Sequence, residues 1–257
     1  MKPEREPLPT RVRDLPGLPA TYADALDRGL ADLDLELDDP ARAAVDGHVS
    51  LLLAWTRAIN LTAIREPVAV ATAHVLDSLS AVPRLRAMDV SRILDLGSGG
   101  GYPGLPLAAA LPAATVTLLE PIGKKAAFLR AAVEATGLAE RVAVVSERAE
   151  ALAADRASRG SWSVVTARAV ASTGELVELA FPLLAPGGAL VAWKRGDLAA
   201  ELAGAGRAVE ALGGGTLDVD DVAIEGLAGH RLVVATRTGR VPDSYPRDPG
   251  ARRRRPW

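Results

Sequence analysis

The chain has 257 residues, a net charge of −2 and a hydrophobic fraction of 49%, which is ordinary for a globular protein with one large domain and an appendage. Cysteine is absent, and this excludes disulfide frameworks, thiolate metal sites and cysteine nucleophiles. The 3 histidines, His48, His74 and His230, are not spaced as metal ligands, so we expect no metal site.

The charge is distributed unevenly along the chain. Residues 1–46 carry 6 basic and 11 acidic side chains, whereas residues 231–257 carry 8 basic and 2 acidic ones. A cationic C-terminus indicates a polyanionic partner, although a disordered solubilising tail has the same composition. Residues 1–14 lack the apolar segment of a signal peptide, and prolines interrupt the uncharged residues 96–119. We therefore expect a cytoplasmic protein without a membrane span.

The predicted organisation has four regions, which are a loose leader over 1–20, a helical extension over 21–87, an α/β domain over 88–240 and a basic tail over 241–257. In the extension, Asp39 and Pro40 predict the cap and the first position of a helix. A further helix begins at Pro67, and His74 and Asp77 share one of its faces. This pair is either a hydrogen-bond cluster or part of a binding face.

From residue 88 onward, short apolar runs alternate with helical segments. The runs predict strands at Arg92–Leu96, Thr115–Glu120, Val142–Ser146, Ser163–Ala167, Ala189–Lys194, Thr216–Ile224 and His230–Thr236. The remaining segments predict helices at Gly104–Leu111, Lys124–Thr136, Ala149–Ala157, Thr173–Leu184 and Leu198–Leu212. Such alternation predicts a parallel sheet covered on both faces, and the short last connection predicts an antiparallel final pair. A Rossmann-like doubly wound α/β sheet with reversed last strands is the layout of class I S-adenosylmethionine-dependent methyltransferases.

A glycine-rich segment, Asp95–Gly104, directly follows the first predicted strand. Ligands of open α/β sheets bind at the carboxyl ends of the strands, where glycines allow close approach to the backbone. The carboxylate of Asp95 suits a cationic cofactor such as S-adenosylmethionine. Gly99, Gly101 and Gly104 also satisfy G-x-G-x-x-G, so an NAD-type oxidoreductase remains an alternative. A Walker-type loop is excluded because no Gly-Lys-Ser/Thr ends the run.

Polar residues also follow the next three strands. Glu120 closes the second strand, where an acid accepts hydrogen bonds from ribose hydroxyls; its alternative role is to complement a helix dipole. Ala149 and Glu150 follow the third strand and could contact an adenine edge, although Glu150 also suits a first helical turn. Arg168 follows the fourth strand and faces either the pocket or solvent.

Five sequence blocks together resemble the bacterial small-subunit rRNA methyltransferase G family, also called glucose-inhibited division protein B. In chain order the blocks are Asn60–Arg65, His74–Leu79, Asp95–Gly104, Thr166–Ala171 and Tyr245–Gly250. The resemblance implies transfer of a methyl group from S-adenosylmethionine to a guanine N7 in the 530 loop of 16S rRNA, with S-adenosylhomocysteine as product. The sequence departs from the family at Gly100, at Tyr102 and in the turn that contains Lys194.

The resemblance also implies roles for particular residues. Gly97 and Tyr102 match cofactor contacts, Ala149 and Glu150 match a pair that flanks the adenine, and Arg168 matches a cofactor-site arginine. Together with the strand ends, this predicts the cofactor-binding residues Gly97, Ser98, Gly99, Tyr102, Glu120, Ala149, Glu150 and Arg168.

The residue types fit methylation at N7. The chain has no thiolate for attack on a pyrimidine, and Arg168–Ala171 is not the Asn/Asp-Pro-Pro-aromatic turn that methylation of amino groups uses. Guanine N7 offers a free lone pair and carries no proton, so orientation suffices and we expect no catalytic acid or base. Ribose 2′-O transfer with Lys194 as the base, and methylation of a small molecule, remain alternatives.

The basic tail predicts the RNA contacts, because guanidinium groups match phosphate oxygens. The predicted RNA-binding residues are Lys194, Arg247, Arg252, Arg253, Arg254 and Arg255. Tyr102 or Trp193 could stack on an extruded base. We expect a monomer whose partner is 16S rRNA or a small-subunit precursor; a catalytically silent RNA-binding module is the remaining alternative.

Overall fold

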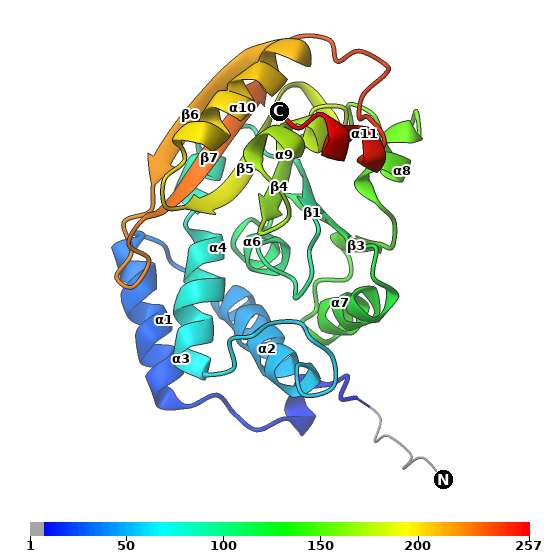
Figure 1. Ribbon diagram of the computed structural model, residues 1–257. Helices are drawn as coiled ribbons and strands as arrows, with labels where there is room; N and C mark the ends of the chain where they lie inside the picture. The colour runs from blue at the N-terminus through cyan, green and yellow to red at the C-terminus, as the bar shows by residue number, and fades with distance from the viewer. Residues whose placement is uncertain (1–7) are drawn as a thin grey trace.

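A seven-stranded sheet forms the centre of the computed structural model, which describes residues 8–257 (Figure 1). The strand order is β3-β2-β1-β4-β5-β7-β6; β1 to β5 are parallel, and β7 is antiparallel to both β5 and β6. The strands are β1 (Arg92–Leu96), β2 (Thr115–Leu119), β3 (Val142–Val145), β4 (Trp162–Arg168), β5 (Leu184–Arg195), β6 (Gly215–Asp221) and β7 (His230–Arg237). The predicted doubly wound sheet with reversed last strands is confirmed.

Apolar content determines how deeply each strand is buried. Ile93 and Leu94 of β1 point to opposite faces, and both are fully buried because helices cover the sheet on both sides. The edge strand β6 is largely exposed and carries Asp218, Asp220 and Asp221. Charges on an edge strand oppose pairing with a second chain.

Helices pack on both faces of the sheet. On one face of the sheet, Ile93 and Val164 pack in a core with the N-terminal helices and also with α6 and α7. On the other face, Leu94 and Val165 pack in a second core with α8, α9 and α10. These helices are α6 (Gly104–Ala110), α7 (Gly123–Ala135), α8 (Ala149–Ala154), α9 (Thr173–Ala180) and α10 (Ala199–Ala211). The prediction that the helix at Thr173 continues to Leu184 is wrong, because Pro182 cannot extend it.

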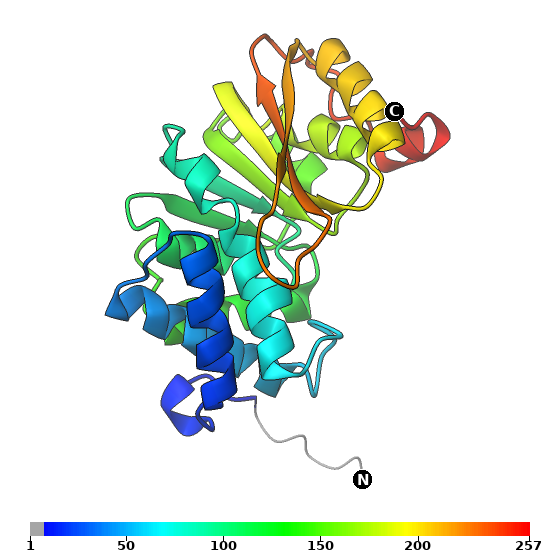
Figure 2. The ribbon, with the colours of Figure 1, turned by 90° about the vertical axis from the view of Figure 1, so that its left-hand side faces the viewer.

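The N-terminal helices form a layer on one face of the sheet (Figure 2). They are η1 (Val12–Asp14), α1 (Ala20–Asp32), α2 (Asp39–Trp55), α3 (Pro67–Val70), η2 (Ala71–Leu76), α4 (Asp77–Leu79) and α5 (Val82–Arg86). Residues 67–79 form one helical stretch whose middle, η2, is π-helical. Helix α2 begins one residue earlier than predicted: Asp38, rather than Asp39, caps it by accepting the Ala41 amide at 2.8 Å.

The predicted loose leader lies partly outside the described residues, which begin at residue 8. From there on, the prediction is wrong, because apolar side chains of the leader pack against the core. Leu8, Val12, Leu15 and Leu18 are all partly buried there, and the Trp55 indole donates a hydrogen bond to the Pro9 carbonyl at 2.7 Å. The division of the chain into four regions stays a prediction.

The last helix, α11 (Pro249–Arg254), lies beside α8 and α9, at the end of the molecule opposite the N-terminal helices (Figures 1 and 2). The tail is therefore docked on the α/β domain, and it reaches the carboxyl ends of the parallel strands. Among residues 8–257, no helix combines the length and apolarity that crossing a bilayer requires.

Candidate functional site

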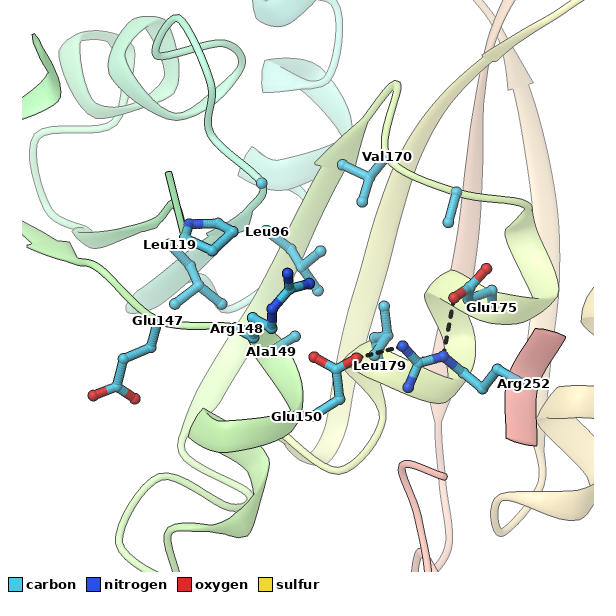
Figure 3. Close-up of a pocket in the computed structure, with 13 residues that line it drawn as sticks. Leu96, Leu119, Glu147, Arg148, Ala149, Glu150, Val170, Glu175, Leu179 and Arg252 are labelled. Atoms are coloured by element: carbon cyan, nitrogen blue, oxygen red, sulfur yellow. Dashed lines mark hydrogen bonds and ion pairs between the residues drawn. The ribbon is translucent and has the colours of Figure 1, made fainter. Parts of the chain in front are cut away.

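A cavity of about 280 Å³ opens where β1, β2, β3 and β4 end (Figure 3). This is the position at which open α/β sheets bind ligands, and the volume lies close to the lower limit, about 300 Å³, of typical ligand pockets. The lining residues are Leu96, Gly97, Leu119, Pro121, Glu147, Arg148, Ala149, Glu150, Val170, Ala171, Glu175, Leu179 and Arg252. The site therefore combines an apolar floor with charged walls.

Gly97 is the part of the glycine loop that reaches the cavity. Its φ of +76° lies in the left-handed region, and an added Cβ would lie 2.8 Å from Cγ2 of Val170. Both the backbone conformation and the close approach of Val170 therefore require glycine. Ser98 and Gly99 continue the loop, but they do not line this cavity.

Asp95 holds the glycine loop from beneath. Its side chain is 1% exposed, and its two oxygens accept hydrogen bonds from the Thr166 hydroxyl at 2.9 Å and the Gly104 amide at 3.2 Å. Burial raises the pKa of Asp95 to about 6. Asp95 thus joins β1, β4 and the start of α6, and it does not line the cavity, so its role as a partner of a cationic ligand stays a prediction.

Glu120 has a similar position under the loop. Its carboxylate accepts the Gly99 amide at 2.9 Å and the Ile122 amide at 2.8 Å, and its side chain is buried outside the cavity lining. Each oxygen of a carboxylate can accept a second hydrogen bond. The predicted contact with a ribose therefore stays a prediction, whereas the support that Glu120 gives to Gly99 is directly visible.

Three carboxylates surround the cavity. Glu147 and Glu150 flank the start of α8, and Glu175 projects from α9 (Figure 3). Burial alone would raise the pKa of Glu150, but a hydrogen bond from Arg252 outweighs it and keeps this pKa below its ordinary value. Glu150 is therefore ionised at neutral pH, and Ala149 lines the cavity beside it. Contact of this pair with an adenine stays a prediction.

Tyr102 and Arg168 do not line the cavity. The Tyr102 ring is buried between the rings of His48 and His74, at centroid distances of 4.5 and 4.8 Å. Arg168 lies over the same ring at 5.3 Å and donates to Asp77 Oδ2 at 2.9 Å. Both side chains contact the N-terminal helical layer, and their predicted contact with a cofactor stays a prediction.

Asp77 is the centre of that buried network. Besides Arg168 of β4, His230 of β7 contacts Asp77 Oδ1 at 2.9 Å, and the Trp193 indole of β5 donates to the Asp77 carbonyl at 2.6 Å. His74 contacts Nη2 of Arg168 at 3.1 Å. The His74–Asp77 pair is therefore a hydrogen-bond cluster that joins three strands to the helical layer, and the buried Trp193 is not placed to stack on a base.

Three of the predicted RNA-binding residues are engaged within the chain. Lys194 Nζ lies 2.7 Å from Glu201 and donates to the Ala171 carbonyl at 2.8 Å. Arg247 pairs with the fully buried Glu178, and Arg252 pairs with Glu150 and Glu175. The prediction that these three face phosphates is therefore corrected. Arg253, Arg254 and Arg255 are exposed.

Comparison with known proteins identifies the family. A family model described as GidB, rRNA small subunit methyltransferase G, matches residues 42–226. This chain belongs to that family. Among the proteins named ribosomal RNA small subunit methyltransferase G, that of Chloroflexus aggregans is 40% identical over 222 residues, which are 86% of this chain and 92% of the relative. That of Roseiflexus sp. is 42% identical over 206 residues, or 80% of this chain and 87% of the relative.

The methyltransferase fold is also found among solved structures. The apo crystal structure of the S-adenosylmethionine-dependent methyltransferase SibL aligns with a TM-score of 0.53 and 21% identity, and the alignment covers 85% of this chain and 76% of SibL. This likeness concerns the fold alone. The predicted class I sheet and the predicted membership of the rRNA small subunit methyltransferase G family are both confirmed.

Several lining residues of this family member were not predicted from the sequence. Glu147 and Arg148 directly precede the predicted pair at the end of β3, so their position in the chain could have indicated them. Glu175 and Leu179 lie four residues apart on one face of α9. That spacing is typical of any amphipathic helix, so it carries no specific signal for a site.

His48 connects α2 to the glycine loop and is neutral at physiological pH. Its Nε2 lies 2.7 Å from the Gly100 carbonyl and donates to it, which leaves Nδ1 as the unprotonated nitrogen. Because burial disfavours the charged form, the pKa of His48 is lowered to about 4. Protonation of His48 therefore acts against folding.

We expect this histidine to make the protein less stable in acid. The unfolded state binds a proton at His48 below about pH 6.5, whereas the folded state does so only below about pH 4. The contribution of neutral His48 to the free energy of unfolding is therefore complete above pH 6.5 and is lost as the pH falls towards 4. Urea unfolding of wild type and of His48→Gln, each at pH 7 and at pH 4.5, measures this contribution. The stability advantage of wild type over His48→Gln is expected to shrink by about 2.4 kcal/mol between pH 7 and pH 4.5; an unchanged advantage would show that His48 does not titrate in this way.

Proposed function

We propose that this chain transfers the methyl group of S-adenosylmethionine to N7 of a guanine in the 530 loop of 16S rRNA, with S-adenosylhomocysteine as the product. Membership of the rRNA small subunit methyltransferase G family supports the reaction and the substrate. The observation that carries the proposal within the molecule is the cavity at the carboxyl ends of the parallel strands, which is lined by Gly97 and three carboxylates.

The residues present fit this donor. Gly97 leaves room for a ligand against the backbone, a space that a Cβ would enter, and Leu96, Leu119 and Leu179 form an apolar floor. Ala149 and Glu150 would hold the adenine end. The lining carries the three carboxylates together with the guanidinium groups of Arg148 and Arg252, so only a small excess of negative charge favours a cationic ligand. When bound, S-adenosylmethionine supplies a methyl group on a positively charged sulfur.

The chain's part in the reaction is to orient the reactants. Guanine N7 has a free lone pair and no proton to lose, so alignment can account for a large share of the acceleration, roughly 7–11 kcal/mol. We therefore assign no catalytic acid or base.

Ribose 2′-O transfer is less well supported. Its base would be Lys194, but Nζ of Lys194 donates to the Ala171 carbonyl and pairs with Glu201, which also accepts the Thr173 hydroxyl at 2.6 Å. Lys194 and Glu201 thus hold the turn after β4, of which Ala171 lines the cavity. This arrangement supports Lys194 as a positioning residue for that turn.

We expect Lys194→Met to lower the rate of methyl transfer by about tenfold, because a lost hydrogen bond to a charged group costs about 1.5–3 kcal/mol. The shape of the pH profile of kcat is expected to stay unchanged. Glu201→Gln is the matched variant and is expected to give a similar loss, with Lys194→Arg partly restoring the rate. A loss above a thousandfold that removes the basic limb of the pH profile, with Glu201→Gln fully active, would identify Lys194 as a general base instead.

The RNA is bound in this proposal by the exposed arginines of the tail. Arg253, Arg254 and Arg255 lie directly after Arg252, which lines the cavity, so phosphate contacts there would place an RNA strand beside the donor. We further propose that the enzyme acts as a monomer in the cytoplasm, where small subunits and their precursors are available.

Transfer of labelled methyl groups tests the function. Wild-type protein is incubated with labelled S-adenosylmethionine and either deproteinised 16S rRNA or small subunits, and the product is cleaved at N7-methylguanosine. Label in the RNA with one scission in the 530 loop is the expected result. Label without scission would indicate another position, label only in small molecules would favour the small-molecule alternative, and RNA binding without label would favour a silent binding module.

A further inference from the structure

Helix α11 carries two kinds of arginine. Arg252 is only 7% exposed and lines the cavity, whereas its neighbours Arg253 and Arg254 are exposed. The helix begins after Asp248, whose side chain accepts the Ala251 amide at 2.9 Å. One short helix therefore has an inner face directed at the cavity and an outer face directed at solvent.

The guanidinium of Arg252 joins two walls of the cavity (Figure 3). Nε of Arg252 donates to Glu175 of α9 at 2.9 Å, Nη2 pairs with Glu150 of α8, and Nη1 donates to the Arg247 carbonyl at 2.6 Å. The planar fork of an arginine can hold two carboxylates in fixed positions, which a lysine cannot do. Glu150 and Glu175 are thus placed by a residue that comes 77 to 102 positions later in the chain.

Further contacts hold the tail in this position. Glu178 accepts hydrogen bonds from the Arg247 amide at 2.7 Å and from the Trp257 indole at 2.6 Å, and it also pairs with the Arg247 guanidinium. An added Cβ at Gly174 of α9 would lie 2.6 Å from Cβ of Trp257, so the last residue packs closely on that helix. Arg252 is therefore held between anchored segments on both sides.

We propose that Arg252 is a positioning residue of the methyl-donor site, and that α11 divides its arginines between the donor, on its inner face, and RNA, on its outer face. This inference rests on the proposed function. Arg252 completes the wall at the adenine end by fixing Glu150 beside Ala149. Arg253 and its exposed neighbours contribute only to the binding of phosphates.

The proposal has a physical consequence for donor affinity. Without Arg252, Glu150 and Glu175 are two like charges on facing walls, and each loses its hydrogen-bonded partner. Repulsion and hydration then draw the two carboxylates apart, so the wall that Arg252 organises is no longer preformed. Loss of preorganisation weakens binding even where the lost group makes no contact with the ligand.

Substitutions at the neighbouring residues Arg252 and Arg253 test whether the arginines of α11 are divided between the donor and RNA. We expect Arg252→Gln to raise the dissociation constant of S-adenosylhomocysteine about tenfold, as measured by calorimetry, while retention of 16S rRNA on a filter stays unchanged. Arg253→Gln is expected to weaken rRNA retention and leave the affinity for S-adenosylhomocysteine as in wild type. Arg207→Gln, on the exposed side of α10, is the control and is expected to change neither.

Two more variants keep the test decisive. Arg252→Lys, which keeps the charge but lacks the fork, is expected to give an intermediate dissociation constant. Glu175→Gln removes one of the two bridged carboxylates and is expected to weaken binding in a protein that still has Arg252, which covers the case that Arg252→Gln does not fold.

Each outcome has a distinct meaning. If wild type binds S-adenosylhomocysteine and methylates rRNA, but both Arg252→Gln and Glu175→Gln bind as tightly as wild type, the inference about α11 is wrong and the proposed function stands. The same conclusion holds if Arg252→Gln reduces only rRNA retention. If wild type neither binds S-adenosylhomocysteine nor methylates rRNA, both the proposed function and this inference fail.

Discussion

Gly97→Ala is expected to raise the dissociation constant of S-adenosylhomocysteine about a hundredfold, which corresponds to about 2.8 kcal/mol. An alanine at this position would adopt a φ of +76°, which costs about 1–2 kcal/mol, and its Cβ would lie 2.8 Å from Val170. Val170 must then move into the cavity that it lines, or the loop must move away from the sheet. Either movement removes the space that a donor would occupy against the backbone.

The matched control for Gly97→Ala is Gly137→Ala. Gly137 follows α7 with a φ of +72°, so an alanine there has the same backbone strain, but an added Cβ would have no atom within 4 Å. Gly137→Ala is therefore expected to lose stability without losing affinity. Equal affinity of the two variants for S-adenosylhomocysteine, measured by calorimetry on folded protein, would contradict the role assigned to Gly97.

Glu178→Gln is expected to lower the free energy of unfolding by about 3 kcal/mol at pH 7. Glu178 is fully buried and accepts the amide and the guanidinium of Arg247 as well as the indole of Trp257. Burial alone would raise the pKa of Glu178, but these donors outweigh it and hold the pKa below its ordinary value, so the carboxylate is charged at neutral pH. A neutral amide leaves the partly buried Arg247 without its counter-charge.

Urea unfolding measures this loss, and hydrogen exchange locates it. Amides of residues 245–257 are expected to exchange faster in Glu178→Gln, because the tail opens before the sheet does. Glu210→Gln, an exposed carboxylate on α10, is expected to change stability by less than 0.5 kcal/mol, the roughly neutral effect of surface changes. A Glu178→Gln protein as stable as Glu210→Gln would show that the tail is not anchored in this way.

Acid is expected to have the same effect as the Glu178 substitution. The depressed pKa of Glu178 means that its contribution to stability is complete above the ordinary glutamate pKa, about 4.3, and is lost as the pH falls below it. His48 loses its contribution at higher pH, between 6.5 and 4, so the two groups act in adjoining pH ranges.

The sheet could be predicted from the sequence because its signals are local. Each parallel strand is a short apolar run, and each run is separated from the next by a helical segment, so the class of fold follows from the alternation. The glycine loop is likewise local: it directly follows β1, which places it at the carboxyl edge of the sheet. Of the predicted cofactor residues, Gly97, Ala149 and Glu150 line the cavity for this reason.

Long-range ion pairs explain most of what could not be predicted. The sequence left Arg168 facing either the pocket or solvent, whereas in the structure it pairs with Asp77, which lies 91 residues earlier in the chain. Arg247 and Arg252 belong to a run of cations that is typical of a polyanion-binding tail, but their carboxylate partners lie on α8 and α9. The composition gives the number of charged residues, but only the tertiary structure determines which of their charges neutralise one another.

A crystal structure of the protein grown with saturating S-adenosylhomocysteine tests the donor site most directly. We expect electron density for the ligand against Gly97, with its adenine beside Ala149 and Glu150. Density for the ligand at another place in the molecule, with this cavity unchanged, would contradict the assignment of the donor site.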